Sequence, residues 1–476
     1  MQHYTHSLLT LRFSTLFFHA PMAFSHDLEV ESSSPPLVFD VRRSEPELVA
    51  PAKPTPRENK LLSDIDTQAG LRIQIPIIQF YRNNQSMAGK DPVKAIRHAL
   101  AETLVFYYPL AGRIKDGPDG SLVVDCNEEG VMFIEADADI TLQQFGHTIK
   151  PPFPNFEELL YQPPGSEAVT NTPIFIIQVT RLKCGGFILA LRFNHTIVDG
   201  VGVFQFATTM AGIARGVLQE PPFEPLWHRD LLRARDPPRV TFNHREYEQL
   251  TDSGDAVQQN FEQRSFFFGP AETAAIRALL PRDLDQHATT FEVLTSYVWR
   301  CRTRALQFNP KEDVRMMCIV DARGKFTSAL LTNYYGSCFG FPASVAAAGE
   351  LSSEPLEYAV RLIQKARSEV SEEYVHSVAD LMATSGRPLF TVVRSCLVLD
   401  TTDIGFRDLD LGWGKAVYGG MAVAGAGTFP AVNFHVPSQN AKGEEGIMVL
   451  VSLPSQVMKI FAKELDDNLV KTNTTI

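Results

Sequence analysis

The sequence predicts an α/β protein made of two domains of similar size. Three observations support this fold class. The chain has 476 residues, and at about 150 residues per domain this length indicates two to four domains. Predicted helices and strands alternate in each half of the chain. Between the halves, residues 218–262 are rich in proline and charge and only weakly periodic, which is typical of a linker.

The first 36 residues are expected to be a variable or disordered N-terminus. Residues 1–26 contain no acidic side chain, but Arg12 interrupts their apolar stretch and weakens the interpretation as a secretory signal. We favour an upstream start codon, with Met22 as the functional start, over a transit peptide. The rest of the chain divides into an N-terminal domain, a linker and a C-terminal domain, at residues 37–217, 218–262 and 263–476.

Hydrophobic periodicity and turn residues predict the elements of the first domain. Pro76 indicates that its strand is an edge strand or contains a bulge. Gly185-Gly186 joins two apolar runs as a hairpin. The predicted elements are, in order, strands at 37–43 and 71–81, a helix at 92–107, strands around 121–126 and 130–137, strands at 174–183 and 187–194, and a helix over 201–215.

The second domain shows the same alternation of helices and strands. Thr290 lies near the predicted cap of its first long helix. The predicted elements are, in order, a helix over 288–306, a strand from 314 that runs into a turn at 325, a helical stretch over 356–382, a strand at 389–400, a glycine-rich loop at 410–420, strands at 429–437 and 446–454, and a terminal helix over 455–470.

Composition and charge exclude several classes of protein. Hydrophobic residues make up 44% of the chain, which is enough for ordinary globular cores. The formal net charge of -11 argues against general electrostatic binding to nucleic acid or anionic lipid. No run of about 18 apolar residues is present, so we expect no transmembrane helix. We therefore expect neither nucleic acid nor membrane as a partner.

The cysteines and one sequence pattern favour a cytoplasmic protein. The six cysteines have no short repeated spacing, which is typical of reduced, mostly buried thiols. Asn194-His195-Thr196 matches a glycosylation acceptor, and a glycan there would obstruct His195. The cysteines lie at positions 126, 184, 301, 318, 338 and 396.

The sequence FNHTIVDG, residues 193–200, places His195 and Asp199 four positions apart at the end of a buried strand. Histidine is the natural general base because its ordinary pKa lies near working pH. From position alone, a hydrogen-bonded structural histidine is the more common case. A zinc site is disfavoured because no HExxH or CxxC pattern supplies a third ligand. The chain also lacks the GxSxG elbow of serine hydrolases.

A second motif, DLGWG, spans residues 410–414. Two glycines around Trp413 predict a tight loop that fixes the indole in place. Asp410 is suited to accept hydrogen bonds from loop amides or to pair with a cation. Taken alone, the motif is more typical of a packed tryptophan corner than of a functional site.

Together, these two motifs resemble those of the plant BAHD acyl-CoA-dependent acyltransferases. The usual second motif there is Asp-Phe-Gly-Trp-Gly, so Leu411 replaces a phenylalanine. YYPLAGR, VDARGKF and GRPLFTVVRS also look like family blocks, and the resemblance extends from about Leu37 over nearly the whole chain. LVFDVRRSEPELVAPAKPTP and KGEEGIMVLVSLP look closest to the alcohol acyltransferase branch, which includes benzyl alcohol benzoyltransferases.

The resemblance implies a chloramphenicol acetyltransferase-like fold. It has two domains of similar size, each a mixed β-sheet with helices, and a channel between them. Residues 218–262 would form a long crossover. Acyl-CoA and an alcohol would enter from opposite faces and meet at His195. Acyl-CoA would be a co-substrate, no cofactor or metal would be bound, and the enzyme would act as a monomer.

The implied chemistry is general-base catalysis without an acyl-enzyme, in which neutral His195 takes the proton of the attacking alcohol. Asp199 either orients the imidazole, as the aspartate of a triad does, or, as the resemblance implies, points away from the channel and pairs with an arginine, for which Arg323 is the match. Trp413 either donates its indole N–H to the oxyanion or packs away from the channel. Asp410 either fixes the loop or acts beside the histidine.

Coenzyme contacts are expected from two places. Phosphates require cations, for which Arg323, Lys325 and Lys415 are candidates. Tyr335 and Gly336 belong to a block that resembles a family segment near the coenzyme channel. Two departures from the family pattern lie here: Ser337 replaces a common asparagine, and the preceding loop, FTSALLTN, lacks the usual prolines.

We therefore predict an acyl-CoA-dependent O-acyltransferase that forms esters from small primary aliphatic or benzylic alcohols and acetyl- or benzoyl-CoA. Within the family, the alternative acceptors are a phenylpropanoid or terpenoid alcohol, or an amine. From a different class, the alternative is a catalytically inactive relative that binds a ligand or partner. Intact His195 and an intact Trp413 loop argue against an inactive relative.

Overall fold

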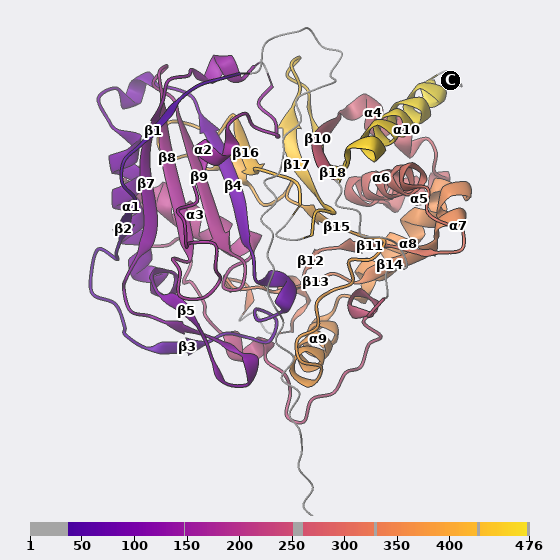
Figure 1. The fold of residues 1–476 in the computed structure, drawn as a ribbon, viewed down its shortest axis with the longest axis horizontal. Helices are drawn as coiled ribbons and strands as arrows, with labels where there is room; N and C mark the ends of the chain where they lie inside the picture. The colour runs from indigo at the N-terminus through magenta and orange to yellow at the C-terminus, as the bar shows by residue number, and fades with distance from the viewer. Residues whose placement is uncertain (1–36, 147, 251–259, 328–330, 426–428, 474–476) are drawn as a thin grey trace, which may run out of the picture.

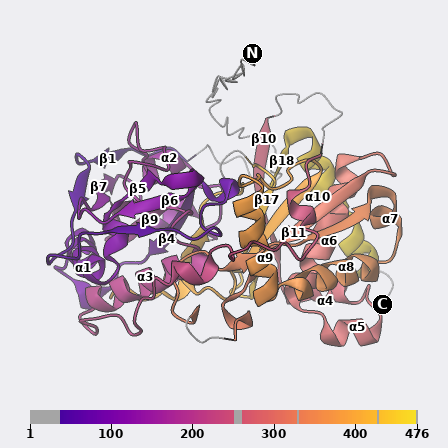
Figure 2. The same ribbon diagram turned by 90° about the horizontal axis from the view of Figure 1, so that it is seen from below.

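The computed structural model describes residues 37–146, 148–250, 260–327, 331–425 and 429–473 (Figure 1). Within them the chain forms two α/β halves that lie side by side, as the second view shows (Figure 2). No helix in these ranges is long and apolar enough to cross a bilayer. The expectations of a disordered terminus over residues 1–36 and of a start at Met22 lie outside the described residues.

The first half is organised around a seven-stranded mixed sheet with the path β1-β7-β8-β9-β4-β16, and β2 also pairs with β7. β7 and β8 are parallel, whereas the other neighbouring strands are antiparallel. Helices α1 and α3 pack against each other beside this sheet. The bounds are β1 Val41–Arg43, β2 Glu47–Val49, β4 Gln74–Tyr81, α1 Pro92–Phe106, β7 Val131–Ala138, β8 Phe175–Leu182, β9 Phe187–Asn194, α3 Gly200–Ala214 and β16 Tyr418–Met421.

The second half is organised around a six-stranded mixed sheet with the order β10-β18-β17-β15-β11-β14. β15 is parallel to both of its neighbours, β11 and β17. Helix α6 packs between α8 and α10. The bounds are β10 Phe261–Phe268, α6 Thr290–Leu306, β11 Asp313–Cys318, β14 Ala343–Ala347, α8 Leu356–Glu369, β15 Ser395–Asp400, β17 Val432–Gln439, β18 Glu445–Pro454 and α10 Ser455–Asn473.

Smaller elements complete the described part of the chain. β3, β6 and β5 form a three-stranded sheet, and β12 pairs with β13. Their bounds and those of the short helices are β3 Asn59–Leu61, β5 Arg113–Asp116, β6 Leu122–Asp125, α2 Phe156–Leu159, α4 Pro270–Arg277, α5 Arg282–His287, β12 Val320–Asp321, β13 Phe339–Gly340, α7 Ala348–Ser353 and α9 Glu372–Thr384.

The mixed sheets with their helices confirm the predicted fold class, but several elements differ from the prediction. The strand expected at 37–43 is reduced to Val41–Arg43, and the glycine-rich loop expected at 410–420 ends in β16. Two further elements differ in extent. The helical stretch at 356–382 is two helices, because Ser371 caps a new helix by accepting a hydrogen bond from the backbone N–H of Tyr374. Acidic residues in the first turn of α9 favour this start. The strand expected at 389–400 shortens to 395–400, because residues 386–394 form a loop instead.

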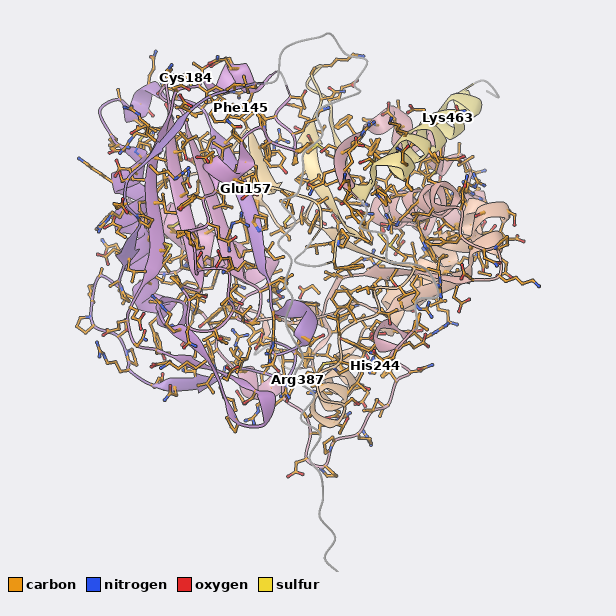
Figure 3. The ribbon with its side chains drawn as sticks, viewed as in Figure 1. Phe145, Glu157, Cys184, His244, Arg387 and Lys463 are labelled. Atoms are coloured by element: carbon orange, nitrogen blue, oxygen red, sulfur yellow. The ribbon has the colours of Figure 1, made fainter. Side chains whose placement is uncertain are left out.

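The described part of the segment predicted as a linker, residues 218–250 and 260–262, includes a strap that packs against both halves. From 215 to 250 the described chain contains only short 3-10 turns besides irregular structure. Helix α9 fastens it: Arg235 pairs with Asp380, and the Oγ of Ser377 accepts backbone N–H groups of the strap. His244, labelled beside this helix in Figure 3, contacts Ser377 through Nε2 at 2.8 Å.

β16 makes the two halves interdependent. It belongs to the second half of the sequence but pairs with β4 of the first sheet, from Tyr418 opposite Phe80 to Met421 opposite Ile77. In Figure 1 this orange strand lies beside the indigo β4. The sequence division at 263 is therefore not a clean division in space. Pro76 lies just beyond the end of β16, where the sheet tolerates a proline.

Candidate active site

His195 lies at the point where β9 ends. Its backbone N–H donates to the carbonyl of Ile73 at 2.9 Å, and its own carbonyl accepts from the Oγ of Ser337 at 3.4 Å. Asn194 turns the chain here, because its Oδ1 accepts from the backbone N–H of Thr196 at 3.2 Å and from the Thr196 hydroxyl at 2.6 Å. The asparagine is fully buried, so the glycosylation pattern is inaccessible in the folded chain.

The imidazole borders an apolar cavity between the two halves. The cavity has an empty volume of about 800 Å³, part of it open to solvent. Alternate residues on one face of each bordering strand supply its walls, as the two-residue period of a strand requires. Those from the first half are Ile73, Ile75 and Ile77, and those from the second half are Leu397, Leu399, Thr401, Val432 and Phe434.

Three polar side chains of the described part of the chain line this cavity, and two of them are bonded elsewhere. The Nε2 of Gln68 donates to the carbonyl of Ile65 at 2.8 Å, and its Oε1 accepts from the hydroxyl of Tyr247. The hydroxyl of Thr401 donates to the carbonyl of His435 at 2.7 Å. Among the described residues, no side chain hydrogen-bonds the imidazole of His195. Of the three polar groups, the imidazole of His195 is therefore the one that is free to hydrogen-bond a substrate.

The surroundings of His195 keep it suited to act as a base. Burial lowers its pKa below the ordinary value, because the charged imidazolium loses hydration. The residue's own backbone and the carboxylates of Asp199 and Asp66 oppose this effect without overcoming it. The neutral form, which can accept a proton, therefore predominates at pH 7.

Asp199 takes the loop-shaping position rather than the orienting one. Its carboxylate accepts from the Nη2 of Arg323 at 2.8 and 2.9 Å and from the backbone N–H of Gly202 at 2.9 Å, which caps α3. It also accepts from the backbone N–H of Cys338 at 3.3 Å. No hydrogen bond joins it to His195, so the triad-like alternative has no support in this geometry.

Arg323 is committed to the fold. Its Nη1 donates to Asp321, its Nε donates to the carbonyl of Tyr334, and its Nη2 donates to the carbonyl of Gly336 as well as to Asp199. Burial works to lower its pKa, but the two carboxylates outweigh burial and raise it. The expectation that Arg323 binds a coenzyme phosphate is therefore wrong, because every guanidinium nitrogen is already bonded.

Trp413 lies at the far end of the strand that delivers His195. Its indole packs edge-on against Phe187 with a centroid distance of 5.2 Å. Phe187 opens β9, and eight residues at about 3.3 Å each put roughly 26 Å between it and His195. Figure 3 labels Cys184 in the hairpin turn at this distant end. The alternative in which Trp413 donates to the oxyanion is therefore wrong, since the indole cannot reach the imidazole.

Asp410 shapes the second motif. Its Oδ1 accepts from the backbone N–H of Gly412 at 2.7 Å and of Gly414 at 2.9 Å. Both glycines have left-handed backbone, with φ of 108° and 91°, which side chains disfavour. The loop leads directly into β16, so it fixes the strand that joins the halves. A direct catalytic role for Asp410 beside His195 is excluded by the same distance.

The remaining predicted contact residues do not line the cavity. Lys415 is exposed, belongs to the distant loop and pairs with Asp408 at 2.7 Å. Lys325 is also exposed. Tyr335 is buried against Tyr107, with ring centroids 5.3 Å apart. Gly336 is buried too, where it packs against Arg229, and it is not among the wall residues of this cavity, so coenzyme contacts of this block stay a prediction.

Sequence reasoning missed the residues that form the walls. They come from segments far apart in the chain, and each segment looks like ordinary core. One face of the predicted strand carries alternating wall residues, Leu397, Leu399 and Thr401. This alternation predicted a strand, but it did not indicate that the face lines a cavity. The aromatic wall residues of the short strand β13 and of irregular segments gave no signal at all; they include Phe339, Phe341 and Phe390.

Comparisons with known proteins agree with this architecture. Residues 39–468 match the model of the Transferase family. The chain is 55% identical to a benzyl alcohol O-benzoyltransferase of Petunia hybrida over 436 residues, which cover 91% of this chain and 94% of that protein. It is 50% identical to alcohol acyltransferase 16 of Actinidia chinensis var. chinensis over 435 residues, again 91% of this chain and 94% of that protein.

Solved structures show the same fold. Vinorine synthase superposes with a TM-score of 0.70 at 20% identity, covering 90% of this chain and 98% of that one. F. graminearum TRI101, complexed with coenzyme A and deoxynivalenol, gives a TM-score of 0.63 at 16% identity, with coverages of 84% and 96%. On this evidence the chain belongs to the Transferase family, the BAHD acyltransferases that its two motifs resemble.

Proposed function

We propose that this protein is an acyl-CoA-dependent alcohol O-acyltransferase that makes esters from small primary alcohols, aliphatic or benzylic, and acetyl- or benzoyl-CoA. Relatives at 50–55% identity are named benzyl alcohol O-benzoyltransferase and alcohol acyltransferase, which supports this reaction class. A solved neighbour that carries coenzyme A supports acyl-CoA as the co-substrate. The six free cysteines are compatible with a reducing, cytoplasmic setting, and we propose a monomer without a bound cofactor.

One observation carries the choice of acceptor: among the described residues, His195 is the single titratable side chain on the cavity wall, and the other two polar side chains, Gln68 and Thr401, are bonded elsewhere. A simple alcohol has one polar group, its hydroxyl, and this group would meet the imidazole. A second hydroxyl or a carboxylate would be buried without a partner, which costs about 1–3 kcal/mol or more. Polyhydroxylated and charged acceptors are therefore disfavoured, as are the phenylpropanoid alternatives that carry such groups.

In the proposed mechanism the alcohol hydroxyl donates its proton to neutral His195 while its oxygen attacks the thioester carbonyl. A new C–O bond forms and the carbonyl becomes a tetrahedral oxyanion. The C–S bond then breaks, and the imidazolium returns the proton to the departing coenzyme A thiolate. Ester and free thiol are the products, and His195 is regenerated neutral.

A covalent acyl-enzyme is unnecessary, and the thiols are poorly placed for one. No cysteine of the described residues lies on the cavity wall. Burial raises the pKa of the Cys126 and Cys318 thiols to about 12, so neither forms a thiolate readily at neutral pH. The proposed transfer is therefore direct.

A donor-by-acceptor matrix tests the proposal. Acetyl-, benzoyl- and longer acyl-CoAs are combined with hexanol, benzyl alcohol, a diol of similar size and a hydroxycinnamic acid, and esters are detected by mass. We expect ester from the simple alcohols and at least about tenfold less from the diol and the acid. The absence of turnover with every pair would contradict the enzyme itself, and a preference for the acid would contradict the acceptor class.

A further inference from the structure

The block Tyr334-Tyr335-Gly336-Ser337, which the cavity does not use, encloses a buried ion pair behind the His195 loop. Arg229 comes from the crossover strap, and Asp66 comes from the segment that follows β3. Their side chains are 1% and 0% exposed, and the Nη1 of Arg229 lies 2.8 Å from the Oδ1 of Asp66. A fully buried pair of charges needs close partners to offset lost hydration.

Asp66 has such partners on both oxygens. Oδ1 accepts from the backbone N–H of Ser337 at 3.0 Å in addition to Arg229. Oδ2 accepts from the backbone N–H of Ser63 at 3.1 Å and from its hydroxyl at 2.6 Å. The carboxylate therefore joins the first half, the crossover and the second half at one point.

The aromatic block forms a cradle for Arg229. The guanidinium lies 4.5 Å from the centroid of Trp227 and 4.9 Å from that of Tyr334, whose hydroxyl accepts from Nη1 at 2.9 Å. A Cβ on Gly336 would come within 1.4 Å of Nη1, so a side chain there would displace the arginine. This packing explains why glycine follows the two tyrosines.

The pair touches the backbone of the loop that presents His195. The Nη2 of Arg229 donates to the carbonyl of Ile197 at 2.6 Å. Ser337, which binds Asp66 through its N–H, donates its hydroxyl to the carbonyl of His195 at 3.4 Å. Asp66 and Arg229 therefore hold the loop from the side away from the cavity.

We propose that Asp66 and Arg229 are positioning residues for His195: the pair fixes the backbone of its loop, and the balance of its two opposite charges sets the protonation of the imidazole. This proposal rests on the proposed function in taking His195 as the base. Neither residue lines the cavity, so the pair acts on the chemistry only through His195.

The charges that face His195 occur as two opposed pairs. Asp199 at the start of α3 is paired with Arg323, which also contacts Asp321, and Asp66 is paired with Arg229. Tyr334 and Cys338 lie between these pairs, and burial raises the pKa of each, which keeps them neutral. The negative charge of Asp66 acts to raise the pKa of His195 against the effect of burial. Removal of Asp66 or Arg229 leaves the other member of that pair uncompensated behind the loop of the imidazole.

The two single variants should therefore move the pH profile in opposite directions. The value of kcat/KM rises with pH as His195 loses its proton. Asp66→Asn leaves the positive charge of Arg229 unbalanced, which should lower the pKa of His195. The acidic limb of the pH profile of kcat/KM should therefore move to lower pH by about 0.5–1 unit. Arg229→Gln leaves Asp66 unbalanced, and the limb should move to higher pH by a similar amount. Shifts of the same sign, or none, would overturn the proposal.

Two controls separate this effect from instability and from the identity of the base. Asp380→Asn breaks a buried contact of the same crossover with Arg235, so it should lower the melting temperature without moving the limb. His195→Ala should abolish the limb. If the limb survives in His195→Ala, the proposed base is wrong; if it is lost there but does not move in the Asp66 and Arg229 variants, only the positioning proposal fails.

Milder variants keep the test decisive if a single variant does not fold. Arg229→Lys retains the positive charge. The double variant Asp66→Asn with Arg229→Met removes both charges, and a buried site tolerates the loss of both charges better than the loss of one. For both we expect an unmoved limb, an unchanged KM for alcohol and acyl-CoA, and a kcat lower by about 10- to 100-fold, because the base is misplaced. Wild-type kcat in a folded double variant would contradict the proposal.

Discussion

The two motif loops at opposite ends of β9 have different tasks. The loop that begins at His195 opens onto an apolar cavity and is backed by two buried ion pairs. The DLGWG loop packs Trp413 against the first residue of the same strand and leads into β16, which ties the second half of the chain to the first sheet. A specific motif can therefore mark a structural joint as readily as a reactive group.

The largest expected effect tests the reactive end. His195→Ala should lower kcat/KM by about 10²–10⁴-fold, because no other described side chain on the cavity wall can take the proton. The melting temperature should change little. Initial rates of thiol release measure the loss, and His98→Ala, on the exposed face of α1, is the matched control. Full turnover in His195→Ala would contradict general-base catalysis.

Replacement of Asp199 should affect stability and activity together. Asp199→Asn leaves the buried Arg323 with only the half-exposed Asp321 as a carboxylate partner, at a cost of up to about 3–5 kcal/mol of unfolding free energy. Asp410→Asn, in the distal loop, should cost only about 1 kcal/mol, since its nearest cation, Arg215, is partly exposed and 3.7 Å away. Denaturant unfolding compares the two. Lost activity in Asp199→Asn with unchanged stability would restore the orienting role.

Trp413 should matter for stability alone. Trp413→Ala removes a buried indole and should cost about 3–5 kcal/mol of unfolding free energy. The kcat of the folded protein should fall less than about tenfold, whereas loss of an oxyanion donor typically costs 10²–10³-fold. Trp413→Phe, which keeps most of the packing but lacks the N–H, is the control. A hundredfold loss of kcat in a stable Trp413→Phe would contradict this and support a catalytic role for the indole N–H.

The smallest expected effect concerns selectivity at the cavity. Phe390 lies beside Gly70 of the other half, where a Cβ would come within 2.4 Å of its ring. Phe390→Ala should enlarge the cavity and raise the kcat/KM ratio of bulky over short alcohols about tenfold. Leu389→Ala, at an exposed neighbour, should leave the ratio unchanged. An unchanged kcat/KM ratio in Phe390→Ala would show that Phe390 does not limit the size of the alcohol.

The sequence by itself determined the local elements and the reactive residue. Apolar runs around Gly185-Gly186 predicted the hairpin that delivers His195, and the structure has that hairpin. Helical periodicity predicted α1 and α6 nearly to their ends. These patterns report which face of an element is buried, and that information is local. The missed break at Ser371 had a local signal too, since a serine followed by two acidic residues starts a helix.

Only the tertiary structure decided what each buried face meets. It placed Arg323 against Asp199 and Arg229 against Asp66, although each pair is more than a hundred residues apart in the chain. It also moved Trp413 to the far end of β9 by inserting β16 beside β4. The physical reason is that a buried charge or ring needs a partner within a few ångströms, and sequence spacing carries no information about which distant segment supplies it.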